Sequence, residues 1–307
     1  MAINTLAYAT LFMQELDKQV VAGATSGWME GNAGLVIYNG GNEVKIPKLA
    51  MDGLGNYDRS LGFTQGAATL AYETKTMGQD RGRTFMLDSM DVNETNFVAN
   101  ASNLMGEFQR TQVIPEIDAY RYSKIASLAI AGSRASGGYT PIVADILSKL
   151  KADIAAIQDA IGAVPLVITM SIATLNILEG STELVRQLEV GAFSGTILSE
   201  VKKVDECPIM EVPSARLKTA YVFNDGKTAG QEAGGYVPAG TAKSINWIIS
   251  AATSPIAISK TDNMRIFSPD VNQGADAWKL DYRKYHDLWI LDNKLPTIFV
   301  NVKEALA

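Results

Sequence analysis

The chain has 307 residues, of which 47% are hydrophobic and 20% are charged, and its formal net charge at pH 7 is -6. This composition is typical of a folded globular protein and excludes a disordered chain. The acidic balance argues against a dedicated nucleic-acid binder, because such a protein concentrates Lys and Arg on one surface.

The single cysteine, Cys207, and the single histidine, His286, limit the chemistry that the chain can carry. One cysteine excludes an intrachain disulfide, and most transition-metal sites need two or more His or Cys ligands. No apolar run reaches the ~18 residues of a membrane-spanning helix, and the first residues lack the basic region of a secretion signal. We therefore expect no metal or cofactor site, no membrane contact, and a protein that stays where it is made.

Residues 1–34 are expected to form an arm. A short amphipathic pattern is followed by "VVAGATSGWMEGNAGLV", which is rich in glycine and small residues. A segment with so few apolar anchors of its own does not build a core.

Residues 35–92 are expected to form extended ribbons. In "NEVKIPKL", Val44 and Ile46 alternate with charged residues, which is the period of a half-buried strand, and Pro47 is tolerated only at an edge or at the end of pairing. Two more extended stretches, "AATLAYETKTMG" and "GRTFMLDSM", follow a loop with four glycines in seventeen residues. A two-stranded ribbon is marginally stable alone in water, so we expect this segment to lie on another surface.

Two helices are predicted next. "DVNETNFVANASNLMGEFQRTQ" predicts the first, with Asn93 or Thr95 as its N-cap. The second begins at Pro115, because proline suits the first helical turn, and Gly132 can close it.

The second helix has an unexpected cation. Glu116 and Asp118 complement the positive end of its dipole. Its apolar stripe is formed by Ile114, Ile117, Ile125 and Leu128. Arg121 lies in the middle of that stripe, so a feature outside this helix must account for it.

The rest of the chain mixes helices and strands, as a layered α+β domain requires. "PIVADILSKLKADIAAIQDAIG" predicts a helix beginning at Pro141, "VPLVITMS" a buried strand, and "IATLNILEGSTELVRQLEV" another helix. "CPIMEVPSARL", "KTAYVFND", "SINWIISA" and "SPIAISKTDNMRIFSP" predict short strands, and the tail from Ala277 has two extended stretches.

A fragment of a phosphate-binding loop occurs at Gly226-Lys227-Thr228. A complete loop needs a glycine where Tyr221 stands and a helix afterwards, which this sequence does not provide. We interpret the fragment as a polar turn between strands. Similarly, Gly53-x-Gly55 lacks the third glycine of a dinucleotide fingerprint, and we interpret it as a loop tip.

Cys207 and His286 are the remaining candidates for catalysis, as a nucleophile and its base. Both lie in apolar or aromatic surroundings, which favours a buried thiol and a packed imidazole instead. The carboxylates are scattered without pairing. We therefore predict no catalytic, cofactor-binding or metal residues, and a protein that is not an enzyme.

A loose arm, a ribbon that cannot fold alone and a helix with a cation in its apolar stripe each need a partner. The physical inference is a structural subunit of a homo-oligomer.

The order of these segments, with "DRGRTF", "DVNET", "FQRTQVIPEIDAYRYSKIA" and "WKLDYRKYHDLWIL", resembles the major capsid proteins of tailed bacteriophages over essentially the whole chain. The resemblance implies the Hong Kong-type capsid fold, an α+β fold. The expected parts are an N-terminal arm (1–34), an extended β-hairpin loop (35–92), a peripheral domain with a long spine helix (93–139), an axial domain (140–261), and return strands of the peripheral domain with the C-terminal segment (262–307).

The function implied by the resemblance is assembly. Hexamers and pentamers would close into an icosahedral shell around double-stranded DNA, without reading its sequence. The expected partners are further copies of the chain, a portal protein, a separate scaffolding protein and a decoration protein. The expected location is the virion, assembled in the host bacterial cytoplasm.

The resemblance offers one explanation of Arg121, an ion pair with a carboxylate from an arm or loop that lies over the spine helix. The alternative is a guanidinium that extends to solvent from an ordinary core. Both interpretations stay open.

Some members of this family are cross-linked between a loop lysine and an asparagine, promoted by a glutamate. Loop lysines are present at Lys45, Lys48 and Lys75, but the stretch 277–291 offers only Asp281 and Asp287. We therefore expect no covalent cross-link.

Three rival functions remain. An encapsulin-type compartment, which packages cargo enzymes, has the same fold, and nuclease-protected DNA in purified particles would distinguish the two. An enzyme would lose turnover on mutation of Cys207 or His286. A tail or baseplate component would form tubes or discs.

Overall fold

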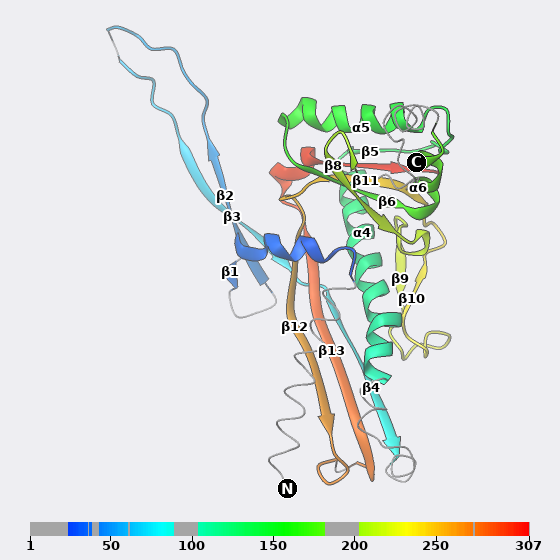
Figure 1. Cartoon of the computed structure of the whole chain (residues 1–307). Coiled ribbons are helices and arrows are strands. Elements are labelled where there is room, and N and C mark those ends of the chain that lie inside the picture. The colour runs from blue at the N-terminus through cyan, green and yellow to red at the C-terminus, as the bar shows by residue number, and fades with distance from the viewer. Residues whose placement is uncertain are drawn as a thin grey trace, which may run out of the picture.

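The computed structural model describes residues 24–35, 37–38, 43–60, 62–88, 104–181, 203–272 and 274–306. The helices predicted in residues 1–23 and 93–103, and the predicted continuation of a helix through 182–190, lie outside these residues. Within the described part, an elongated body carries one long hairpin that projects away from it (Figure 1).

A long helix forms one side of the body. Helical residues 104–108 lead through a π-helical turn, η2 (Gln109–Val113), into α4 (Ile114–Ala131). Pro115 lies in the first turn of α4, as predicted, but the helical conformation begins before it.

α4 ends at Gly132, as predicted. Gly132 is the C-cap residue, and its φ is -85°, which any residue adopts. Ser133 has the left-handed conformation instead, with a φ of 55°. The bond from Arg134 N to Ala129 O, at 2.8 Å, closes the turn around it.

A three-stranded antiparallel sheet lies beside α4 in the order β12-β13-β4. Its strands are β12 (Ile256–Phe267), β13 (Ala277–Trp289) and β4 (Gln79–Asp88). β4 was expected within the extended loop, but it pairs with β13 along its length. β12 also runs across the boundary predicted between residues 261 and 262.

A six-stranded mixed sheet forms the other end of the body, in the order β5-β14-β11-β6-β8-β7. Its strands are β5 (Ala135–Ser136), β14 (Ile298–Val302), β11 (Ile245–Ala251), β6 (Leu166–Ser171), β8 (Cys207–Val212) and β7 (Lys203–Val204). The second extended stretch of the tail forms β14 of this sheet.

Helices α5 (Ile146–Ile161) and α6 (Ile172–Glu179) pack with this sheet. The predicted apolar stripe of α5 is buried at Ile146, Leu150, Ile154 and Ile157. Pro141 does not begin the helix, because a turn at residues 143–145 precedes it, and Ile142 is exposed. α6 begins at Ser171, whose hydroxyl accepts a bond from Thr174 N at 3.2 Å, and ends at Gly180.

Smaller elements connect these layers. They are η1 (Gly27–Leu35), β1 (Ile37–Tyr38), η3 (Ser214–Arg216), the hairpin of β9 (Tyr221–Phe223) and β10 (Tyr236–Pro238), and η4 (Asp292–Thr297). No described helix is long and apolar enough to cross a membrane.

Candidate assembly surface

The projecting hairpin is formed by β2 (Glu43–Met51) and β3 (Ala68–Thr76), which pair from Glu43↔Thr76 to Met51↔Ala68. The two-residue period of its sequence predicted the strand correctly. Pro47 pairs with Tyr72 of β3, and it lies beyond Val44 and Lys45, the two residues of β2 that pair with β1.

The base of the hairpin is anchored in the core. Val44 and Ile46 are 0% and 1% exposed. They belong to one apolar cluster with Ile256, Ile258, Tyr285, Trp289 and Leu291 of the body. Burying two large aliphatic side chains contributes roughly 1.5–3 kcal/mol each, which fixes the direction of the base.

An ion pair adds to this anchor. Lys75 Nζ lies 2.5 Å from Glu73 Oε1 on the same strand and 3.8 Å from Asp292 Oδ1 at the start of η4. The Glu73 carboxylate, followed by Asp292, raises the pKa of Lys75.

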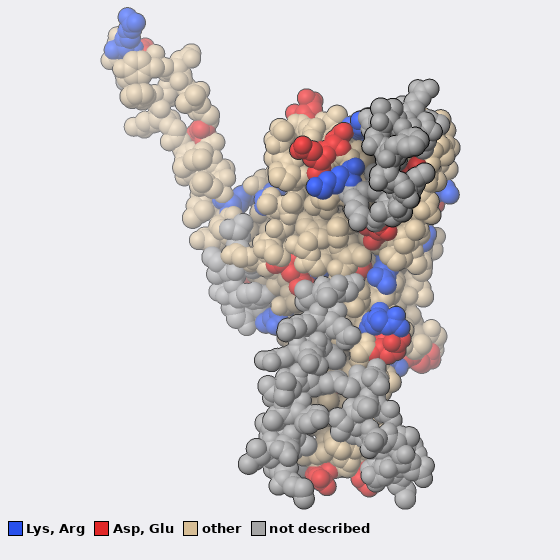
Figure 2. Space-filling view, in the orientation of Figure 1, with Lys and Arg blue, Asp and Glu red and all other residues tan. Residues whose placement is uncertain are grey.

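Beyond Pro47 the hairpin has no body beneath it. Leu49 and Leu70 face each other across the strands, and both are more than half exposed. Other large apolar side chains on this part are also exposed, namely Met51, Leu54, Tyr57, Phe63 and Tyr72. Figure 2 shows the hairpin as a thin projection whose visible surface is mostly uncharged.

The described residues of the tip, 52–60 and 62–67, are held together by local bonds. Asp52 Oδ2 accepts a bond from Ala67 N at 2.7 Å, and Asp58 and Gly62 form an antiparallel bridge. The rings of Tyr57 and Phe63 lie 4.9 Å apart. Gly53 and Gly55 belong to this tip, as predicted.

The apolar side chains that are exposed on this hairpin form a surface that the described residues of the body leave uncovered, because the hairpin projects away from that body (Figure 1). A patch of this kind, with ordered backbone and exposed aromatic rings, is typical of an interface.

Residues 24–35 differ from the loose arm that the sequence predicted. Met29 is 1% exposed and packs in the main core with Tyr122 and Ile125 of α4. η1 crosses β12 and β13 on its way from the base of the hairpin to α4 (Figure 1). This part of the predicted arm is therefore anchored to its own body, whereas residues 1–23 lie outside the described residues.

Arg121 is explained by this segment. Its guanidinium is 1% exposed and forms an ion pair with Glu30 of η1, and it donates to Ser26 O at 3.1 Å. The interpretation as an ion pair with a carboxylate from the arm is confirmed.

Asp118, expected only to complement the helix dipole, is a buried acceptor. Its carboxylate accepts bonds from the hydroxyls of Thr25 and Ser26, at 2.9 and 2.7 Å, and from Arg216 at 3.3 Å. Its position three residues before Arg121, on the same helix face, was a signal of a paired site that the sequence already carried.

Cys207 and His286 lie in different sheets. The Cys207 thiol, on β8, donates to Asp205 O at 3.4 Å, and burial raises its pKa. His286, on β13, packs edge-on against Tyr120 at 5.4 Å between ring centres. In the described residues no group of three or more His, Cys, Asp or Glu side chains could hold a metal ion.

The remaining residues that the sequence singled out lie in turns or strands of the fold. Gly226-Lys227-Thr228 is a turn between β9 and β10, as predicted, and Asp225 accepts bonds from Lys227 N and Thr228 N, both at 2.8 Å. Asp281 accepts a bond from Thr84 at 2.8 Å. Asp287 accepts bonds from Tyr120, Gly78 N and Leu288 N at 2.6–2.8 Å.

No protein-family model and no curated protein matches the sequence. Solved structures do match the fold. The capsid structure of the cyanophage P-SCSP1u aligns with a TM-score of 0.60 at 12% identity, covering 86% of this chain and 84% of that chain. The mature capsid of bacteriophage PhiM1 aligns with a TM-score of 0.59 at 11% identity, covering 87% of this chain and 83% of that chain. The capsid structure of Staphylococcus phage Andhra aligns with a TM-score of 0.54 at 13% identity, covering 87% of this chain and 81% of that chain. The chain therefore has the α+β fold of these phage capsid structures.

Proposed function

We propose that this chain is the major capsid protein of a tailed bacteriophage, with the Hong Kong-type fold, and that its copies close into a shell. The observation that carries the proposal is the projecting hairpin, whose base is buried and whose outer half exposes a row of large apolar side chains. The similarity in fold to three phage capsid structures supports the same reading.

In the shell the hairpin of each copy would lie on a neighbouring copy. Covering Leu49, Met51, Leu54, Tyr57 and Phe63 removes apolar area from water at about 25 cal/mol per Å². Many such modest contacts stabilise a closed assembly, and rotational symmetry lets one surface serve every copy. The copies are expected to form hexamers and pentamers around double-stranded DNA, inside a virion assembled in the host cytoplasm, with portal, scaffolding and decoration proteins as partners.

The role is structural, and we propose no catalysis. The test is the assembly of the purified full-length chain at high concentration, followed by negative-stain microscopy and gradient sedimentation. We expect closed shells. Compact monomers, tubes or discs under all conditions would contradict the proposal.

A matched pair of variants links the result to the hairpin. The triple variant Leu54→Ser, Tyr57→Ser, Phe63→Ser removes the exposed tip side chains and should prevent closure while leaving the far-ultraviolet circular dichroism unchanged. Val271→Ser removes an exposed apolar side chain of the body, and this variant should still assemble.

A further inference from the structure

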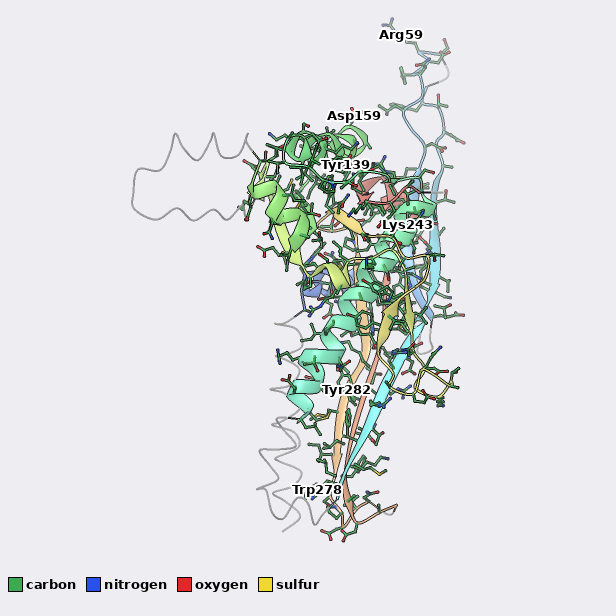
Figure 3. All side chains as sticks on the ribbon, turned by 90° about the vertical axis from the view of Figure 1, so that its right-hand side faces the viewer. Arg59, Tyr139, Asp159, Lys243, Trp278 and Tyr282 are labelled. Atoms are coloured by element: carbon green, nitrogen blue, oxygen red, sulfur yellow. The ribbon has the colours of Figure 1, made fainter. Side chains whose placement is uncertain are left out.

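A cavity of about 640 Å³ lies between the three-stranded sheet, the start of α4 and the loop of the β9–β10 hairpin. We propose that it binds a small organic anion, one carboxylate or phosphate group on an apolar, ring-bearing body. The volume is in the range of ligand sites, about 300–1,000 Å³. Tyr282, labelled in Figure 3, is one of the residues that line it.

The wall formed by the sheet is basic. Arg81 on β4 pairs in register with Lys284 on β13, and Arg83 pairs with Tyr282. Side chains alternate between the faces of a strand, so Arg81, Arg83, Lys284 and His286 share one face. All four line the cavity.

The carboxylates that line the cavity are already bound within the chain. Asp80 accepts a bond from Arg283, and Glu116 forms an ion pair with Arg81. Asp225 accepts bonds from N–H groups of its own turn. Lys284 donates to Asp262 at 2.6 Å. Arg83 donates to the carbonyl of Glu232 at 3.2 Å, and within the described residues it has no carboxylate partner. An uncompensated cation therefore remains at this wall.

A second polar group lacks a partner here. His286 is 4% exposed, and its Nδ1 is buried without a hydrogen bond in the described structure. Burial, followed by the charges of Arg121, Lys284 and Arg81, holds its pKa well below the usual value. The ring is thus neutral, and the positive charges around it disfavour a cation in the cavity.

The opposite part of the cavity is apolar and aromatic. Phe108 packs edge-on against Phe85 at 4.9 Å and against Tyr282 at 6.0 Å between ring centres, and Val113 and Ile117 extend this surface. An inorganic ion would leave this part unfilled. A ligand with a ring against the aromatic side chains and its anionic group toward Arg83 would use both parts.

The single histidine provides the test. The full-length chain, unassembled and labelled with ¹³C at the histidine ring, gives one imidazole signal that needs no assignment. Benzoate represents the carboxylates, adenosine 5′-monophosphate the phosphates, and inorganic phosphate and uncharged benzamide are the comparison probes. We expect a saturable shift with benzoate or the nucleotide, and none with benzamide.

Two arginine variants provide the matched controls. Arg83→Gln should weaken binding by about tenfold or more, the size of a lost charged hydrogen bond. Arg59→Gln removes an exposed arginine at the tip of the projecting hairpin, which does not line the cavity, and should leave binding unchanged. No saturable shift, equal binding of benzamide or of inorganic phosphate, or equal losses in both variants would overturn the inference.

Discussion

The guanidinium of Arg121 and the carboxylate of Glu30 form an ion pair beneath η1, with the arginine 1% exposed and the glutamate 31% exposed. The pair joins two segments that are ninety-one positions apart in the sequence. The pair belongs to a polar cluster in which Asp118 accepts hydrogen bonds from Thr25 and Ser26. This cluster holds residues 24–35 against α4.

Glu30→Gln should therefore lower the free energy of unfolding by about 1–3 kcal/mol, because it leaves a buried cation without its charge partner; the partial exposure of Glu30 keeps the loss below that of a fully buried pair. Urea unfolding measures it. Glu107→Gln, at the exposed pair with Arg110, is the control and should change stability by less than about 0.5 kcal/mol. Equal effects of the two variants would contradict the role of the cluster.

Gly82 on β4 is expected to tolerate no side chain. A Cβ atom there would lie 2.7 Å from the backbone oxygen of Tyr282 on the paired strand β13. Gly82→Ala should therefore distort the three-stranded sheet and lower the free energy of unfolding by roughly 2–4 kcal/mol. Gly31→Ala is the control, because nothing lies within 4 Å of that Cβ. Thermal unfolding should separate the two variants, and a Gly82→Ala protein as stable as the control would disprove the close approach.

The turn between β7 and β8 should be improved by glycine. Asp205 and Glu206 lie between the paired residues Val204 and Cys207, and both have a positive φ, of 46° and 64°. Two-residue hairpin turns of this kind favour glycine, so Glu206→Gly should raise the free energy of unfolding by about 0.5–1 kcal/mol. Chemical denaturation tests it, with Glu211→Gly on β8 as a control that should lower stability.

Stability should fall as the pH decreases below about 6.5, the pKa of an unfolded histidine. The folded pKa of His286 lies well below that value, because the ring is buried near Arg121, Lys284 and Arg81. Between the two pKa values the unfolded chain binds the additional proton, so each pH unit removes up to about 1.4 kcal/mol. His286→Phe keeps a ring beside Tyr120 and should make the free energy of unfolding less dependent on pH between roughly 5.5 and 6.5. In this range most carboxyl groups are already ionised, so they contribute little to the slope. An unchanged slope in the variant would assign the effect to other groups.

Arg59 lies at the far end of the hairpin, where Figure 3 labels it, and it is exposed. In the unassembled chain trypsin should cleave after Arg59 within minutes and leave the body intact. In assembled particles a neighbouring copy should cover the tip and slow this cleavage. Mass spectrometry of timed digests gives both rates. Equal rates before and after assembly would contradict an interface at the tip.

Local sequence patterns were sufficient to predict several elements of the fold. The alternation at Val44 and Ile46, the stripe of α5 and the turn at Gly226 are properties of short segments, and each was predicted from its own residues. The π-helical turn at Gln109–Val113 and the left-handed Ser133 were not, because no local residue preference demands them.

Long-range pairing was not predictable in the same way. β4 was placed with the hairpin because it follows β3 directly, and no partner was predicted for β14, which pairs with β11 and β5. Which strand pairs with which depends on the register and on the apolar faces of segments far away in the sequence. The domain boundaries at residues 34, 92, 139 and 261 stay predictions.

That the chain is an α+β protein with an extended ribbon follows from its sequence, because period and composition are local quantities. The folded structure was needed to show that residues 24–35 bind their own helix through Glu30 and Asp118, and that Arg83 and His286 line one cavity. Those relationships depend on distances between atoms remote along the chain, which no local pattern records.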